Sequence, residues 1–151
     1  MADKVFMYGP LMGGYELAGE LQNYQFLKPI GRGKTPGRLY DLGGYPGAVE
    51  LAGPDQYVYG DLYECNNNDT MNMIDEAAGA VGDDPDLYAF RRRMVVVTLA
   101  NGTVDQAWIF FYTQPVDAFP EIPSGSFRAQ KAEEKKLSRR GFFTRLFPKT
   151  D

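Results

Sequence analysis

Two strand-like segments joined by Asn101-Gly102 constrain the fold of this chain more than any other feature of its sequence. Residues 88–99 and 104–112 are rich in β-branched and aromatic residues, which are typical of strands. The Asn-Gly pair between them is typical of a type I′ turn, so the two segments are predicted to form an antiparallel hairpin. From Ala107 to Tyr112 the second strand is apolar on both faces, which fits a barrel wall or a sheet covered on both sides.

The rest of the 151 residues, a length typical of one domain, predicts shorter strands and two helices. Strands are expected at residues 5–8, 38–42 and 57–65, with a turn around residues 45–47. Helices are expected over residues 13–27 and 70–78, the second with N-cap candidates at residues 66–69. Gly60 indicates a bulge or a close approach of another backbone. The predicted fold class is α+β, a small mixed β-barrel with short helices.

Two absences from the composition exclude several kinds of catalytic and metal site. The chain has no histidine, which excludes Ser-His-Asp and Cys-His catalysis and His-ligated metals. It has one cysteine, Cys65, which excludes an intrachain disulfide and a multi-cysteine metal site and is expected to be a small buried residue. No apolar run is long enough for an export signal or a membrane span, so a cytoplasmic location is predicted.

Charge divides the chain into an acidic body and a basic tail. Residues 128–151 hold eight of the sixteen Lys and Arg residues and three of the twenty acids, which gives +5 and leaves −9 for residues 1–127. An acidic body repels phosphate backbones, so no nucleic-acid partner is expected. The segment Arg139–Phe147 mixes arginine with aromatic residues and could contact a membrane surface or a protein partner. Docking of these aromatics on the body, or a disordered tail, are the alternatives.

A series of short motifs occurs in a specific order. The chain reads VFMYGPLM, then GRLYDLGGYPG, YGDLYE, MIDEAAG, LYAFRRRMVVV, AWIFFY and IPSGSF. Together they resemble the γ-glutamylcyclotransferase-like (AIG2-like) family over roughly residues 4–127. The resemblance implies a domain over residues 1–127 with a small mixed α+β barrel and a cavity at one end. Residues 128–151 would then be a separate basic, aromatic C-terminal tail.

The resemblance also implies a reaction. Family members act on γ-glutamyl amides, whose free α-amino group attacks the γ-carbonyl of the same glutamyl group. This intramolecular acyl transfer forms 5-oxoproline and releases an amine, without a metal or cofactor. One carboxylate can move both protons, and main-chain N–H groups can bind the anionic oxygens. The implied partner is a small γ-glutamyl or amino-acid-like ligand.

Residues that match the family's site are expected to bind the substrate. These are Tyr8, Gly9, Pro10, Leu11 and Met12 in the loop after the first strand, with Tyr88 and Tyr112 bordering the cavity. Pro10 departs from the family pattern because it has no N–H to donate.

Acidic positions of the family are also replaced. The position of the family's catalytic Glu is Ala78, which cannot carry a proton, so the catalytic residue is unknown. Glu76 is a weak substitute, since it lies about 200° away on a helix. Asp61 and Glu64 are further conceivable bases, and Ser126 stands where the family has an acid.

These departures leave three functional predictions open. The chain is a cyclotransferase with a displaced base, or a ligand-binding module that has lost the reaction, or an interaction protein that acts through its tail. Assays of 5-oxoproline formation, ligand-induced thermal stabilisation and liposome binding distinguish them.

Overall fold

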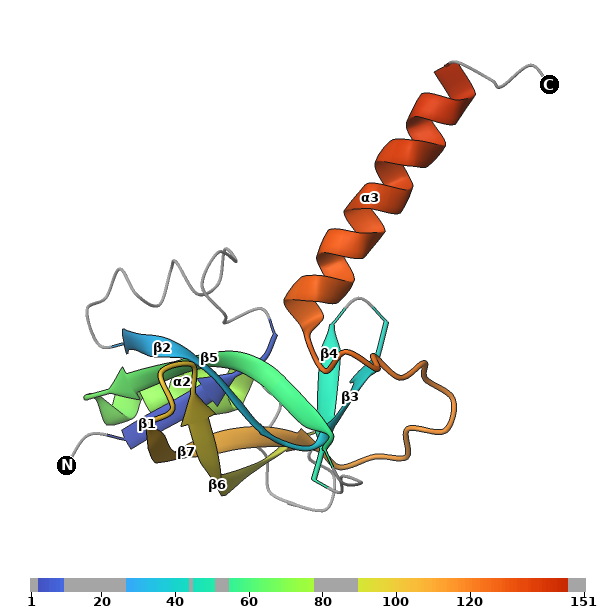
Figure 1. Ribbon diagram of the computed structural model, residues 1–151. Coiled ribbons are helices and arrows are strands. Elements are labelled where there is room, and N and C mark those ends of the chain that lie inside the picture. The colour runs from blue at the N-terminus through green and yellow to red at the C-terminus, as the bar shows by residue number, and fades with distance from the viewer. Residues whose placement is uncertain (1–2, 10–26, 44, 51–54, 78–89, 147–151) are drawn as a thin grey trace.

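The computed structural model describes residues 3–9, 27–43, 45–50, 55–77 and 90–146. Seven strands of this part of the chain form one sheet with the order β1-β5-β2-β6-β7-β4-β3, and β1 also pairs with β7 (Figure 1). The extra pairing closes β1, β5, β2, β6 and β7 into a ring, in agreement with the predicted α+β fold. The elements are β1 (Asp3–Met7), β2 (Leu27–Pro36), β3 (Arg38–Asp41), β4 (Pro46–Val49), β5 (Tyr57–Cys65), α2 (Asn68–Ala77), β6 (Phe90–Leu99), β7 (Val104–Tyr112) and α3 (Phe127–Leu146).

The predicted hairpin is confirmed as β6 and β7, which pair from Phe90 opposite Tyr112 to Thr98 opposite Val104. The predicted type I′ turn is wrong. Gly102 has a φ of 89°, whereas Asn101 has no positive φ, and the N–H of Gly102 donates to the carbonyl of Leu99 at 2.9 Å. The loop therefore has three residues and places only its glycine in the left-handed region.

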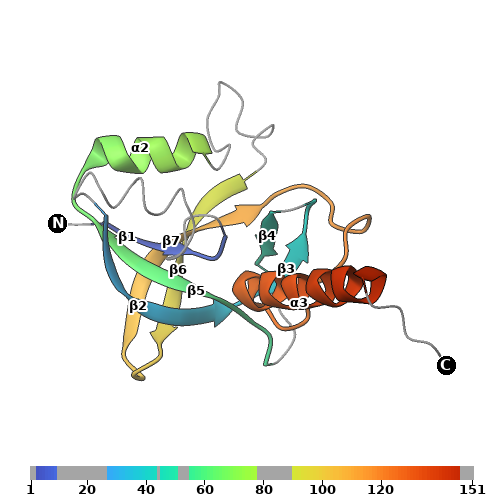
Figure 2. The same ribbon diagram turned by 90° about the horizontal axis from the view of Figure 1, so that it is seen from above.

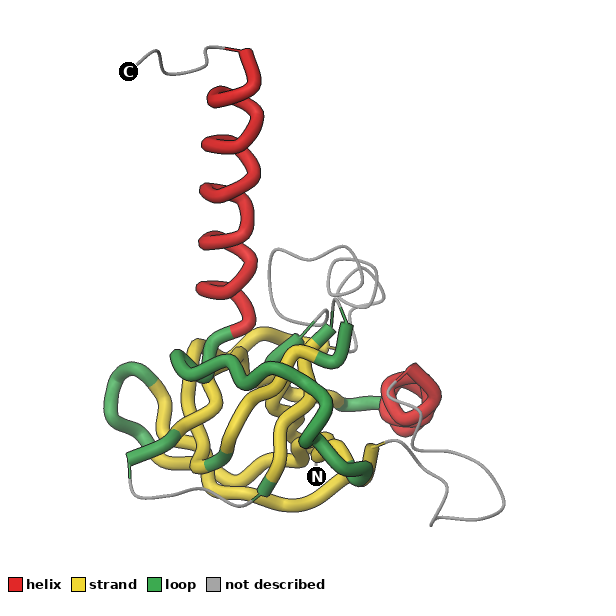
Figure 3. Tube along the Cα trace, turned by 90° about the vertical axis from the view of Figure 1, so that its right-hand side faces the viewer, coloured by secondary structure: helices red, strands yellow, loops and turns green. Residues whose placement is uncertain are grey.

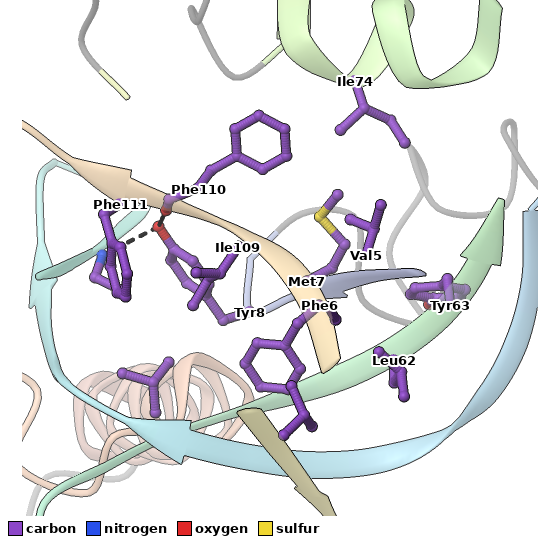
Figure 4. Close-up of a cluster of buried hydrophobic side chains, with 14 of the residues drawn as sticks. Val5, Phe6, Met7, Tyr8, Leu62, Tyr63, Ile74, Ile109, Phe110 and Phe111 are labelled. Carbon is purple, nitrogen blue, oxygen red and sulfur yellow. Dashed lines mark hydrogen bonds between the residues drawn. The ribbon is translucent and has the colours of Figure 1, made fainter. Parts of the chain in front are cut away.

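The last three residues of β1, Val5, Phe6 and Met7, are buried on both faces of the strand, which explains why all three are apolar. Val5 and Met7 point toward Ile74 of α2, whereas Phe6 points into the ring of strands (Figure 4). Helix α2 lies over the outside of the sheet at β1 and β5 (Figure 2). Each fully buried side chain of this size contributes about 1.5–3 kcal/mol, so β1 is a central element of the core.

Several other predictions are confirmed at their stated positions. Strand 57–65 is β5, and Cys65 at its end is buried. Helix α2 begins at Asn68, two residues before the predicted start, and its N-cap is one of the predicted candidates: the side-chain oxygen of Asn67 accepts hydrogen bonds from the N–H groups of Asp69 (2.8 Å) and Thr70 (3.2 Å). At Gly60, a Cβ would lie 2.2 Å from the carbonyl oxygen of Met7, which is the close approach predicted there.

Other segments differ from the predictions or lie outside the described residues. Of the turn predicted around residues 45–47, Tyr45 does lie in the turn between β3 and β4, where its carbonyl accepts a hydrogen bond from the N–H of Leu42 at 2.9 Å, but Pro46 and Gly47 begin strand β4. Strand β2 and helix α3 were not predicted. The predicted helix over 13–27 falls almost entirely outside the described residues, and Leu27 begins β2. Among the described residues, no helix has the length and hydropathy needed to cross a membrane.

Candidate functional site

The loop after β1 starts at the point where β4 replaces β1 as the neighbour of β7. Strand β1 pairs in parallel with β7 at Val5 and Trp108, and β4 pairs in parallel with β7 three residues further on, at Ala48 and Phe111. Strand β1 therefore leaves β7 where β4 joins it. We call the residues at this exchange, Tyr8, Gly9, Pro46 and Tyr112, the strand junction.

Tyr8 holds the strand junction together through its hydroxyl group. This hydroxyl donates a hydrogen bond to the carbonyl of Phe110 on β7 and accepts one from the N–H of Ala48 on β4 at 3.1 Å (Figure 4). The side chain is buried, and burial raises the pKa of the Tyr8 phenol above its usual value. Tyr8 was predicted to contact substrate. In the structure its hydroxyl bonds to two backbone groups, so the side chain joins β4 to β7 at the edge of the predicted site.

Gly9 and Tyr112 are brought together by the first residues of β4. A Cβ on Gly9 would lie 3.0 Å from Cγ of Pro46, and a Cβ on Gly47 would lie 3.2 Å from Cβ of Tyr112. The Tyr112 ring also packs on Phe90, with ring centroids 5.3 Å apart. Of the other predicted binding residues, Pro10, Leu11, Met12 and Tyr88 lie outside the described residues.

An open hollow of about 380 Å³ adjoins Tyr112 at the carboxyl end of β7. Its lining is mostly polar, with a glutamate and two arginines, and consists of Glu50, Arg91, Arg93, Phe111, Tyr112, Thr113 and Gln114. The Arg93 guanidinium lies 3.7 Å from the Glu50 carboxylate, and both side chains are exposed. Guanidinium groups bind carboxylates through paired N–H donors, so the hollow has groups that suit an anionic ligand.

Sequence reasoning did not place this hollow. The arginine triplet at residues 91–93 was visible, and alternation along a strand does send Arg91 and Arg93 to the same face. What it could not show is that the end of β4 brings Glu50 and the end of β7 beside them.

The positions considered as proton carriers differ in what surrounds them. Ala78 lies outside the described residues, and Glu76 is in the last turn of α2. The Asp61 carboxylate is nearly buried and accepts hydrogen bonds from both terminal nitrogens of Arg128, at 2.9 and 3.4 Å. Glu64 lies between Lys4 and Lys28 of the neighbouring strands in the register of the sheet. Asp61 therefore acts as the partner of Arg128.

Two other observations concern the chemistry of the site. Ser126 stands where the resemblance implies an acid, and its hydroxyl oxygen accepts a hydrogen bond from the N–H of Ala129 at 3.1 Å. This contact caps the first turn of α3. Among the described residues, no group of three or more acidic or cysteine side chains is placed to hold a metal ion.

Comparison with known proteins agrees with this architecture. A putative γ-glutamylcyclotransferase of Vibrio cholerae is 32% identical over 127 residues, covering 84% of this chain and 96% of that protein. The crystal structure of YkqA from Bacillus subtilis superposes with a TM-score of 0.69 at 22% identity and covers 90% of this chain, which spans 43% of YkqA. That of a mouse AIG2-like protein superposes with a TM-score of 0.64 at 20% identity, covering 78% of this chain and 82% of that one.

The profile that matches residues 5–129 is described as gamma-glutamyl cyclotransferase, AIG2-like. The matched segment contains the end of β1 and all of β2 to β7, together with the strand junction and the first residues of α3. The chain therefore belongs to the gamma-glutamyl cyclotransferase, AIG2-like family.

Proposed function

We propose that this protein binds a small γ-glutamyl amine or peptide beside the strand junction and has lost the cyclisation reaction of its family. The observation that carries the proposal is the hollow next to Tyr112, which has the guanidinium groups of Arg91 and Arg93 in its lining. By resemblance, Tyr112 matches a position that borders the cavity in the family. A γ-glutamyl compound carries at least one carboxylate, and charge-assisted hydrogen bonds to arginine are the strong kind.

The loss of reaction follows from the proton transfers that cyclisation requires. The α-ammonium must lose a proton before its nitrogen can attack the γ-carbonyl carbon. A carbon–nitrogen bond then forms, the bond to the leaving amine breaks, and that amine must gain a proton. A positioned carboxylate typically contributes 10²–10⁴-fold to such steps. Ala78 has no group that can carry a proton, and Asp61 is held by Arg128.

Binding and turnover are tested separately on the same protein. Calorimetry with γ-glutamyl dipeptides and γ-glutamyl-lysine is expected to show binding, and chromatography is expected to show no 5-oxoproline. Ala78→Glu is expected to raise 5-oxoproline formation by roughly 100-fold or more over the background rate measured without enzyme. Ala77→Glu adds the same carboxylate one residue earlier and serves as the matched control, with no gain expected.

The role of the hollow is tested by removing one of its charges. Arg93→Met should weaken ligand binding roughly tenfold, because a charge-assisted hydrogen bond is lost. Lys28→Met removes a positive charge from an exposed position of β2 and should leave the affinity unchanged.

Two results would overturn the proposal in different ways. Wild-type turnover that Glu76→Gln abolishes would identify an active cyclotransferase with a displaced base. Absence of binding to every γ-glutamyl compound tested would remove the ligand class itself.

A further inference from the structure

Helix α3 stands away from the rest of the described molecule (Figures 1 and 3). The five consecutive residues 132–136 are all exposed. Because successive residues turn by roughly 100° around a helix, these five cover its whole circumference. At residues 132–136, α3 therefore has no side packed on the described body.

The direction of α3 is set by contacts at its first turn. Phe127 is buried in the core, and the Ser126 hydroxyl caps the helix. Arg128 makes its paired hydrogen bonds with Asp61 on β5, and the Lys131 amine lies 5.2 Å from the centre of the Phe127 ring. These contacts join a projecting helix firmly to the sheet.

A polar helix that projects into solvent gains little stability from tertiary packing. Isolated polar helices are marginal in water, and most helical stability in proteins comes from packing against something else. The family match ends at residue 129, so most of α3 lies beyond the part shared with the family. Its distal half carries Arg139, Arg140 and Arg145 close in sequence to Phe142 and Phe143.

We propose that α3 attaches the protein to an anionic lipid surface through residues 139–147. Arginines are attracted to the negative surface potential of such a membrane, and aromatic residues favour the boundary between headgroups and acyl chains. Residues 128–151 carry a net charge of +5, which complements that surface.

The length of α3 also reduces the electrostatic repulsion between the acidic body and an anionic membrane. Residues 1–127 carry −9 and would be repelled by an anionic membrane at close range. Arg139 is eleven residues beyond Arg128, which is about 17 Å along a helix axis. That is about twice the Debye length of roughly 8 Å at physiological ionic strength, so the repulsion is largely screened. In this arrangement α3 acts as a spacer as well as an anchor.

Vesicle sedimentation of the full-length protein tests the anchor. Binding is expected to vesicles of phosphatidylcholine with 30% phosphatidylserine, and not to phosphatidylcholine alone. Each basic residue near the surface strengthens binding about fivefold, so Arg139→Glu/Arg140→Glu should weaken it roughly 25-fold or more. Lys28→Glu/Arg32→Glu reverses two exposed charges of β2 and should change binding less than about twofold. Phe142→Ser/Phe143→Ser should weaken binding roughly tenfold if the aromatics enter the interface.

A second pair of variants tests the spacer. Glu133→Pro and Glu133→Ala remove the same charge, but only proline breaks the helix. Vesicle binding at low salt should be several-fold weaker for the proline variant than for the alanine variant. Equal binding of the two would refute the spacer.

Three outcomes would refute the anchor. They are equal sedimentation of the wild type with both kinds of vesicle, equal binding by the wild type and the Arg139→Glu/Arg140→Glu variant, and self-association in place of vesicle binding. The last, measured by sedimentation equilibrium, would identify a second copy of the chain as the occupant. None of these measurements depends on γ-glutamyl ligands, so they stand or fall separately from the proposed function.

Discussion

Removing one oxygen atom, with Tyr8→Phe, should destabilise the whole sheet. The Tyr8 hydroxyl bonds to the carbonyl of Phe110 and the N–H of Ala48, which lie on two different strands. A buried backbone group left without its partner costs about 1–3 kcal/mol. With two such groups, the free energy of unfolding should fall by about 2–4 kcal/mol. The midpoint of urea unfolding should then fall by about 1–2 M, for a slope of about 2 kcal/mol per M.

The pH dependence of the same variant gives an independent check. Burial raises the pKa of the Tyr8 phenol in the folded protein, whereas an unfolded tyrosine titrates near about 10. The neutral phenol is therefore favoured by folding. Its contribution is complete below about pH 10 and is lost above it, at about 1.4 kcal/mol per pH unit. The stability difference between wild type and Tyr8→Phe should shrink as the pH rises above 10.

Controls separate this effect from a general response to alkali or to loss of a hydroxyl. Burial also raises the pKa of the Cys65 thiol, but that contribution is present in both proteins and cancels in the difference. Tyr59, whose side chain is exposed, provides the matched substitution Tyr59→Phe, with an expected change within about 0.5 kcal/mol. Equal stability of Tyr8→Phe and Tyr59→Phe in urea would show that the hydrogen bonds of the Tyr8 hydroxyl do not stabilise the pairing of β4 with β7.

Two further predictions concern β5. Gly60→Ala should unfold the protein or lower its free energy of unfolding by more than about 4 kcal/mol, because the new Cβ would lie 2.2 Å from the backbone oxygen of Met7. Gly31→Ala, whose Cβ would have nothing within 4 Å, should lower it by less than about 1 kcal/mol, and thermal melting compares the two. A double-mutant cycle with Asp61→Asn and Arg128→Met should give a coupling energy of about 1–3 kcal/mol, since the pair is partly buried and bidentate. Additive effects in that cycle would contradict the anchoring of α3 through this pair.

Strands could be predicted from the sequence where side chains carry the signal. The hairpin and β5 are rich in aromatic and β-branched residues, in runs that match the observed bounds of 57–65 and 104–112. Gly60 was recognisable because a glycine inside such a run typically marks a bulge or the close approach of another backbone. Local sequence therefore determined these elements before tertiary packing was considered.

Strands β2 and β4 were not predictable in the same way. Strand β2 reads LKPIGRGKTP and β4 begins with Pro-Gly, and both residue types are depleted in strands. Their pairing depends on partners distant in the chain: β2 lies against β5 along its length, and β4 against β3 and β7. Because β2 and β4 are stabilised by pairing with distant strands, their own residue composition does not predict them.

Residues of the candidate site could be predicted from the sequence, but their contacts could not, because those contacts depend on how distant strands pair. The resemblance implied that Gly9 and Tyr112 both lie at the substrate site, and in the structure both lie beside the first residues of β4, Pro46 and Gly47. It could not show that the Tyr8 hydroxyl is already engaged by backbone, because that depends on where β1 leaves β7. Helix α3 was missed since its mixed charges have no apolar stripe to mark a packed face.

Ser126 and Ala78, the two positions where the resemblance implies an acid, have different physical consequences. Ser126 keeps a local task, because its hydroxyl caps α3, so the change from an acid there leaves the helix start intact. Ala78 keeps no polar group at all, and Asp61, another conceivable base, is paired with Arg128. The hollow beside Tyr112 meanwhile has Arg91 and Arg93 in its lining. Under the proposed function, such a site would still attract a carboxylate through its cationic groups without turning it over, because affinity depends on charge complementarity while turnover depends on proton transfer.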